Sequence, residues 1–289
     1  MDSTLITVGL PIALAIIMFG LGLSLTPADF RRVARTPRAV AVALVLQVLV
    51  LPLVAFGLVV VFELDPLLAV GVMLLAASPG GTTANLFSHL FRGDVALNIT
   101  LTAINSVLAA VSIPVITNFA IAYFDAEGEL GLQFAKVLQV IAIVLVPVAV
   151  GMVVRQRSSR FATRADRPVR IFSIAVLVVV ALGALLGEQE NLAGYAEQVG
   201  LVTALFCLAS LSLGYGVARL LRLDERQAIA SAMEVGIHNT TIALTIALSV
   251  LDSTQVAVPA AVYSVVMYVL ATAFGYAITR GRRTAVASI

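Results

Sequence analysis

Charged residues are scarce in this chain of 289 residues. They make up 12% of it, whereas hydrophobic residues make up 61% and the mean hydropathy is +1.06. A soluble domain carries about 25% charged residues. The composition therefore excludes an ordinary soluble protein and predicts an integral membrane protein. No segment has the composition of a soluble domain, so residues 1–289 are expected to form one membrane unit without a nucleic-acid partner.

Cysteine is almost absent too. Cys207 is the only one, which excludes a disulfide within the chain and a metal site built from several thiolates. The first residues, MDSTLITVGLPIALAIIMFG, lack a basic segment and predict a membrane span rather than a cleaved signal peptide. The sequence shows no nucleophile paired with a base and no cluster of metal ligands, so an enzyme is not expected.

Long apolar runs, by contrast, are frequent. A membrane-spanning helix needs roughly 20 apolar residues, and nine segments meet this requirement. They predict an all-α polytopic membrane protein with spans at residues 5–25, 39–62, 66–90, 95–123, 134–154, 170–187, 196–220, 226–250 and 254–279.

The connecting segments alternate in charge along the chain. Every arginine falls in the odd-numbered connectors or the tail, and acidic residues dominate the even-numbered connectors. The only lysine, Lys136, begins a span on the acidic side. This positive-inside pattern predicts nine spans in the plasma (inner) membrane, with the N-terminus outside and the C-terminus in the cytoplasm. The longest connector, residues 155–170, is expected to be a basic cytoplasmic loop.

Two segments of the chain look alike. ELDPLLAVGVMLLAASPGGTTANLF begins at Glu63, and RLDERQAIASAMEVGIHNTTIALTI begins at Arg222. Each runs from Leu-Asp through small and apolar residues into a polar cluster, and each lies between apolar spans. Because the two would enter the membrane from opposite sides, they predict an inverted-topology repeat of four spans plus five. Span 134–154 has no partner in this scheme.

The polar clusters interrupt their spans. Pro79 is followed by Gly80 and Gly81, and this combination breaks a helix. The first segment should therefore form two half-helices, although a kinked helix with closely packed small residues is the alternative. The second cluster has only Gly236, so its interruption is inferred mainly from the repeat.

Glu234 is the only acidic residue deep within a predicted span. A carboxylate at such depth by default marks an ion or proton pathway. An ion pair with His238, four residues further on, is the alternative. The surrounding oxygens suit a hard cation, and one or two Na⁺ fit a single carboxylate better than a divalent ion does. These oxygens belong to Gln47, Asn85, Asn98, Thr102 and the free carbonyls of the breaks.

The half-helices also offer positive partial charge. If the two interrupted spans meet at their breaks, two helix N-termini would point toward that place. Their partial positive charge favours an anionic or carbonyl-bearing substrate. Neutral donors near them are Thr82, Thr83, Asn239 and Thr240.

Three stretches carry a resemblance to a known family. IIMFGLGLSLTPADF, SPGGTTANLFSHLFRGDVAL and EVGIHNTT resemble the prokaryotic branch of the sodium/bile acid symporter family. The resemblance implies a panel domain and a core domain built as inverted repeats, with two discontinuous helices crossing in the core. The core would comprise approximately residues 66–154 and 226–279 and the panel 5–62 and 170–220, with span 134–154 unassigned.

The resemblance also implies two Na⁺ sites that share Glu234. The first would comprise the Ala84 carbonyl, Asn85, Asn98, Thr102 and Glu234. The second would comprise Gln47, Glu234, the carbonyls of Val235 and Ile237, and His238. Family members often have serine in place of Ala84 and Asn98, and commonly glutamine in place of His238. Substrate contacts in the family fall near Thr82 and Asn239.

The imidazole of His238 offers a nitrogen, which is a poor ligand for Na⁺. A proton could replace one sodium ion there, or a neutral His238 could be hydrogen-bonded to Gln47 or Glu234.

The leading hypothesis is thus a secondary active symporter that couples Na⁺ to uptake of a small or amphipathic organic anion by alternating access. The anion could be bile acid-like, pantoate-like or a keto acid, and no oligomer is required. The alternatives are a proton-coupled or mixed carrier that uses His238, and a passive or exporter-type carrier. Cys207 is expected to lie away from both breaks and to pack as a small hydrophobic residue.

Overall fold

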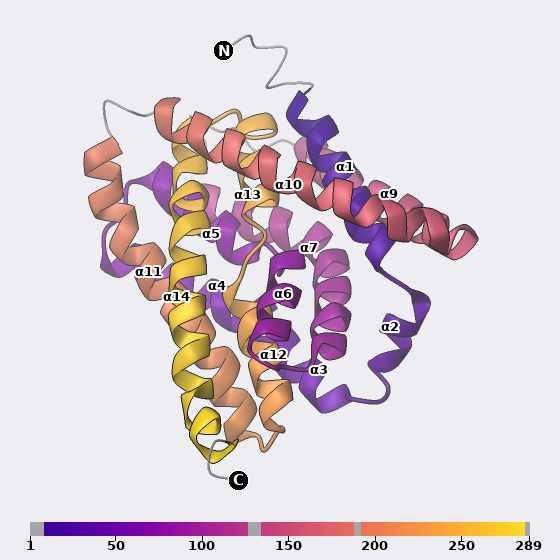
Figure 1. Ribbon diagram of the computed structural model, residues 1–289. Coiled ribbons are helices and arrows are strands. Elements are labelled where there is room, and N and C mark those ends of the chain that lie inside the picture. Colours follow the sequence, from indigo (N-terminus) through magenta and orange to yellow (C-terminus); the bar gives the residue numbers. More distant parts are fainter. Residues whose placement is uncertain (1–8, 127–133, 188–191, 287–289) are drawn as a thin grey trace.

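The computed structural model describes residues 9–126, 134–187 and 192–286, and all regular elements in these ranges are helical (Figure 1). In chain order they are α1 Leu10–Ser24, α2 Pro27–Arg32, α3 Pro37–Val45, the π-helix η2 Leu46–Val50, α4 Leu51–Val61, α5 Pro66–Ala77, α6 Thr82–Leu90, α7 Val95–Tyr123, α9 Phe134–Arg157, α10 Ser159–Gly187, α11 Leu192–Leu220, α12 Glu225–Gly236, α13 Thr240–Ser249 and α14 Thr254–Val286.

The helices have the length and apolarity of a polytopic membrane protein. In the described residues, four helical segments are long and apolar enough to cross a bilayer: 37–61, 95–123, 197–220 and 254–280. Three shorter apolar helices are α1, α5 and α13. The all-α multi-pass architecture is therefore confirmed, while the number of nine spans stays a prediction.

The centre of the molecule is formed by helices that are buried on every side. Residues 68–77 of α5, 228–236 of α12 and 240–247 of α13 are all buried. A helix that is apolar all round, as α5 is, belongs in a protein core. The three buried helices pack against the longer helices α7, α11 and α14 (Figure 1). Close packing is possible because Gly214 of α11 lies where a Cβ atom would be 2.7 Å from the Ala232 Cα atom.

Short turns with the same geometry precede the two interrupted segments. Glu63 and Arg222 both adopt positive φ, at 48° and 59°. The residue after each donates its N–H back to the helix it leaves, Leu64 to Val59 and Leu223 to Ala218. An aspartate then caps the next helix, because its side chain accepts from the free N–H groups of the first turn.

Hydrogen bonds join turns that carry the same sign of charge. The Asp94 N–H donates to the Arg226 carbonyl at 2.8 Å, which joins the arginine-containing turn before α7 to the start of α12. The Gln255 amide donates to the Asp65 carboxylate at 2.8 Å, between two acidic turns. Each pair brings together turns for which the charge pattern predicts the same side of the membrane.

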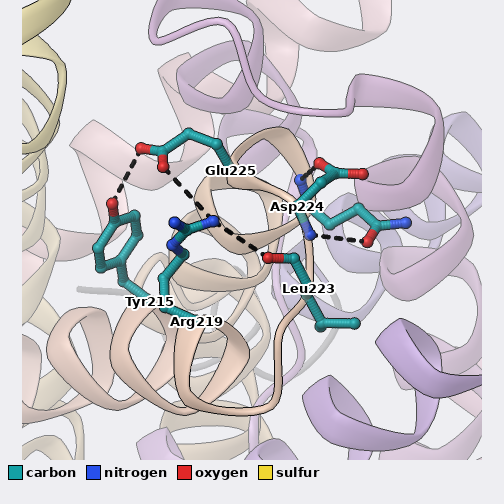
Figure 2. Close-up of polar contacts among 6 residues, drawn as sticks. Tyr215, Arg219, Leu223, Asp224 and Glu225 are labelled. Carbon is teal, nitrogen blue, oxygen red and sulfur yellow. Dashed lines mark hydrogen bonds and ion pairs between the residues drawn. The ribbon is translucent and has the colours of Figure 1, made fainter.

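The corner between α11 and α12 is held by side chains (Figure 2). The Tyr215 hydroxyl donates to Glu225 at 2.9 Å, and Arg219 lies 3.6 Å from the other oxygen of that carboxylate. Arg219 also donates to the Leu223 carbonyl at 3.1 Å. These contacts fix the start of α12 against the end of α11.

Two connectors are more helical than expected. The basic connector 155–170 is a loop only around Ser158, because α10 begins at Ser159 and continues through Pro168 into the predicted span. Arginine and alanine favour helix, so high polarity did not end the helix here. The connector after α1 contains the short helix α2, whose capping box is formed by Thr26 and Asp29. Predicted connectors at 127–133 and 188–191, and the start of the first span, lie outside the described residues.

Candidate cation and anion site

Both polar clusters interrupt their helices. The first interruption, residues 78–81, separates α5 from α6, and the second, residues 237–239, separates α12 from α13. Pro79 lacks an N–H and clashes with a continuing helix, which accounts for the first break. The second break has no proline, and the Ile237 N–H still donates to the Met233 carbonyl before the chain turns into extended conformation.

The two interruptions lie side by side. Gly80 and His238 form an isolated antiparallel bridge, and the Asn239 N–H donates to the Pro79 carbonyl at 2.7 Å. The extended segments thus satisfy some of each other's backbone groups, as buried backbone requires. Two helix C-termini, of α5 and α12, and two helix N-termini, of α6 and α13, meet at this point. They provide negative and positive partial charge respectively.

Glu234 lies in the last turn of α12 and is completely buried. Three side chains of α7 donate to its carboxylate. Asn98 Nδ2 and Thr102 Oγ1 each lie 2.6 Å from Oε2, and Asn105 Nδ2 lies 3.0 Å from Oε1. These three residues recur at intervals of four and three and therefore line one face of α7.

The opposite side of the carboxylate is covered by the first break. A Cβ atom at Gly80 would lie 2.5 Å from the Glu234 carboxyl carbon, so no larger residue fits without displacing it. Among the described residues, no arginine or lysine forms an ion pair with Glu234. His238 does not pair with it either, because α12 ends at Gly236 and the two residues no longer share a helix face.

Several buried amide oxygens near the breaks lack a donor. Gln47, in the π-helix η2, donates its Nε2 to the Ala76 and Ser78 carbonyls at 3.3 and 3.0 Å, while its Oε1 is buried without a partner. The Oδ1 atoms of Asn98 and Asn105 are buried without partners as well. Buried polar atoms are nearly always paired in proteins, so the unpaired oxygens of Gln47 and Asn98, which are residues of the predicted ion sites, are suited to a cation.

The remaining residues of the first predicted ion site lie at the start of α6. Ala84 is buried and Asn85 is partly exposed, with its Oδ1 buried and unpartnered. Within the described part of the chain, no hydrogen bond joins either residue to Glu234. The structure thus brings Asn98 and Thr102 directly to Glu234 and places Ala84 and Asn85 beside the break.

His238 has a different partner from those considered in the sequence. Its Nδ1 lies 3.1 Å from the Tyr263 hydroxyl of α14, and that hydroxyl donates to the Gly236 carbonyl at 2.9 Å. Which of the two groups donates, Nδ1 or the hydroxyl, depends on the tautomer of the imidazole. Nε2 is buried without a partner. Neither Gln47 nor Glu234 takes the expected place beside the ring.

Cys207 was expected away from both breaks, and this is wrong. Its Sγ lies 3.9 Å from the Gly236 carbonyl, because α11 packs along α12 up to the break. It is completely buried. Val235 and Ile237, which were expected to contribute carbonyls, are completely buried on either side of Gly236.

The four predicted substrate donors lie at the N-termini of α6 and α13. Thr82 is exposed and Thr83 is partly exposed. Asn239 is partly exposed and caps α13, with its Oδ1 accepting from the Ile242 N–H at 3.3 Å. Thr240 is buried, so it is the least accessible of the four. A Cβ atom at Gly81 would lie within 4 Å of both Thr83 and Asn239, which shows that these two flank the same glycine.

Sequence reasoning missed three residues of this region: Gly80 as the contact surface of Glu234, Tyr263 as the partner of His238, and Asn105. Asn105 could have been found, because it continues the spacing of Asn98 and Thr102 by one turn of α7. Tyr263 gave no such signal, since its contact depends on how α14 is rotated against the break.

The chain matches proteins of one family. Residues 11–195, more than half of it, match the model of the Sodium Bile acid symporter family. It is 33% identical over 257 residues to the uncharacterized sodium-dependent transporter YocS of Bacillus subtilis, covering 88% of this chain and 78% of that one. It is 27% identical over 246 residues to the ileal sodium/bile acid cotransporter of Homo sapiens, covering 84% and 70%.

A plant relative is longer. The chain is 29% identical over 257 residues to the probable sodium/metabolite cotransporter BASS1, chloroplastic, of Arabidopsis thaliana, covering 88% of this chain and 62% of the relative. The match to the family model, together with the bacterial relative, shows that this chain is a member of the sodium bile acid symporter family.

Proposed function

We propose that the protein is a secondary active transporter that couples inward movement of Na⁺ to uptake of a small or amphipathic organic anion. The observation that carries this proposal is Glu234, completely buried, bonded to three neutral donors and without a basic partner among the described residues. A buried charge without a counter-ion is strongly unfavourable. A cation that binds beside it would supply the missing charge.

The donor set favours Na⁺ over a transition metal. The groups near Glu234 and the breaks are amide, hydroxyl and carbonyl oxygens, which hard cations prefer. No cluster of three or more histidine, cysteine or acidic side chains occurs among the described residues. We assign the first ion to Ala84, Asn85, Asn98, Thr102 and Glu234, and a second to Gln47, Glu234, Val235, Ile237 and His238. The names of two relatives, a sodium-dependent transporter and a sodium/bile acid cotransporter, support Na⁺ as the coupled ion.

The anion would bind at the N-termini of α6 and α13. The partial positive charge of the two helix ends favours a carboxylate, and the partly exposed Thr83 and Asn239 supply neutral donors. Thr82 and Thr240 complete the proposed set. Bile acid-like, pantoate-like and keto acids all fit this chemistry.

Alternating access would follow from the inverted repeat and from movement of a core domain, residues 66–154 and 226–279, against a panel domain, residues 5–62 and 170–220. The similar turns at Glu63 and Arg222, the equal lengths of α5 and α12 at 12 residues each, and the two paired breaks support a repeat. The family places such a transporter in a membrane, and we propose the plasma membrane with a cytoplasmic C-terminus.

The direct test replaces Glu234 by glutamine. In proteoliposomes, the Glu234→Gln variant is expected to lose Na⁺-dependent uptake of a radiolabelled organic anion, because the neutral amide cannot balance a cation. The matched control is Glu225→Gln, which removes a carboxylate from the partly exposed start of the same helix and should retain uptake. Normal uptake by Glu234→Gln under a Na⁺ gradient would refute the proposal.

Coupling to protons is the second candidate, and His238 is the observation in its favour. Its Nε2 is buried without a partner, in a position where a nitrogen is a poor Na⁺ ligand. A proton-coupled or mixed carrier would accumulate substrate under an inward pH gradient in sodium-free buffer, and His238→Gln would abolish this uptake. If a pH gradient drives no uptake in sodium-free buffer, Na⁺ is the coupling ion.

A passive or exporter-type carrier is the remaining alternative. Such a carrier could use a thiolate in the membrane, but Cys207 is completely buried, with its Sγ 3.9 Å from the Gly236 carbonyl oxygen. No contact of Cys207 in the described residues favours this function.

A further inference from the structure

Asn105 of α7 contacts Glu234 but belongs to neither proposed ion site. It is 2% exposed, and its Nδ2 donates to Oε1 of Glu234 at 3.0 Å. The other two donors, Asn98 and Thr102, both bind Oε2. Asn105 is thus the one donor described for Oε1, and it determines how that half of the carboxylate is held.

The orientation of the Asn105 amide is set by this contact. A carboxylate accepts and an amide nitrogen donates, so Nδ2 faces Glu234 and Oδ1 faces elsewhere. Oδ1 is buried and has no donor. A side chain that merely filled space in the core would not leave an amide oxygen unpaired, since an apolar residue of the same size would pack there without that cost. The contact of Nδ2 with Glu234 is therefore the feature that explains an asparagine at this position.

The carboxylate has little freedom on its other side. Gly80 lies so close that a Cβ atom there would be 2.5 Å from Oε1 and 2.7 Å from Oε2. The carboxylate is held between the first break and the polar face of α7. While Asn105 is present, both carboxylate oxygens of Glu234 accept hydrogen bonds, and these bonds oppose rotation about the Cγ–Cδ bond of Glu234. Without Asn105, only Oε2 would be held by donors.

We propose that Asn105 is a positioning residue for cation coupling: it holds Oε1 of Glu234 so that the carboxylate keeps the orientation required to bind the ion. Asn105 acts through Glu234 and is not itself assigned as a ligand. This inference rests on the proposed function, because it presupposes that Glu234 binds a cation.

The test measures the affinity for Na⁺ separately from folding and turnover. The purified full-length protein in detergent is titrated with NaCl against choline chloride, and the melting temperature is recorded at each concentration. For Asn105→Leu, which is similar in size and lacks the amide, the half-saturating Na⁺ concentration is expected to rise by about tenfold or more, as loss of a hydrogen bond to a charged group would produce. In proteoliposomes at saturating Na⁺, the maximal uptake rate should stay within about twofold of wild type.

The matched control is Thr117→Val. Thr117 lies on the same helix, is 4% exposed, and has a buried hydroxyl without a hydrogen-bond partner. Its replacement should leave the half-saturating Na⁺ concentration unchanged. If Asn105→Leu does not fold, Asn105→Ala, which removes the same donor without introducing a branched side chain, takes its place in the same titration.

The outcomes separate this inference from the proposed function. If wild type responds to Na⁺, Glu234→Gln does not, and the Asn105 variant titrates as wild type does, the inference is overturned while the function stands. A lower melting temperature without Na⁺ and slower uptake at an unchanged half-saturating Na⁺ concentration would also overturn it, because they indicate a structural role. If wild type shows no response to Na⁺ in either assay, both are overturned.

Discussion

Gly80 allows the first helix break to lie directly against Glu234. Its neighbour Gly81 has room for a side chain, whereas a Cβ atom at Gly80 would overlap the carboxylate. Gly80 is thus required for close contact with Glu234, whereas Gly81 is not. The sequence Pro79–Gly81 alone did not distinguish these two roles.

This difference gives a prediction for Gly80→Ala. The added methyl group must displace the carboxylate or the break, and overpacking of this kind costs about 1–3 kcal/mol. We expect a lower melting temperature and a loss of Na⁺-dependent uptake of about fivefold or more, since this cost falls on the residue that binds the ion. Gly57→Ala is the control, because a Cβ atom at Gly57 meets nothing within 4 Å. Equal uptake by the two variants would contradict the close contact described for Gly80.

The sequence identified Glu234 correctly as a buried carboxylate but not all of its surroundings. Asn98 and Thr102 contact it, as a shared helix face allowed. His238 was considered as a partner of Glu234 or Gln47 and is instead bonded to Tyr263. Spacing along a helix gives a contact only where the helix continues, and α12 stops between Glu234 and His238.

At the scale of elements, the span predictions agree closely with the helices, and the exceptions have physical causes. Residues 95–123 were predicted as a span and form α7 with the same bounds. The break at Pro79 was predictable from its chemistry. The π-helix η2, which places Gln47 against the carbonyls of the first break, has no signature in its apolar sequence. Such π-bulges occur frequently at functional sites.

The two interrupted segments also resemble one another as elements. The first helix of each segment begins after a residue with positive φ, is capped by an aspartate and runs for 12 residues. The two breaks that follow these helices lie side by side. This agreement supports the proposed inverted repeat more strongly than the similarity of sequence did, because hydropathy alone does not fix the length of a helix or its cap.

At the scale of the whole molecule, the charge pattern predicts which turns face the cytoplasm. The bonds from Asp94 to Arg226 and from Gln255 to Asp65 pair turns in the manner that this pattern requires. The prediction can be tested on intact cells in a Cys207→Ala background. Thr254→Cys, in an acidic turn, should react with a membrane-impermeant thiol reagent, whereas Ser158→Cys, in an arginine-rich turn, should react only after permeabilisation. Labelling of both, or the reverse pattern, would contradict the proposed orientation.

The sequence by itself determined the membrane environment, the approximate limits of most helices, the family and the single deeply buried carboxylate. These follow from composition, hydropathy and motifs, which are local properties of the chain. The tertiary structure decided that the two breaks meet, that Gly80 covers Glu234, that Tyr263 binds His238, and that Asn105 binds Glu234 across 129 positions of sequence. Such contacts depend on how whole helices are rotated and placed against one another, and no local pattern specifies that.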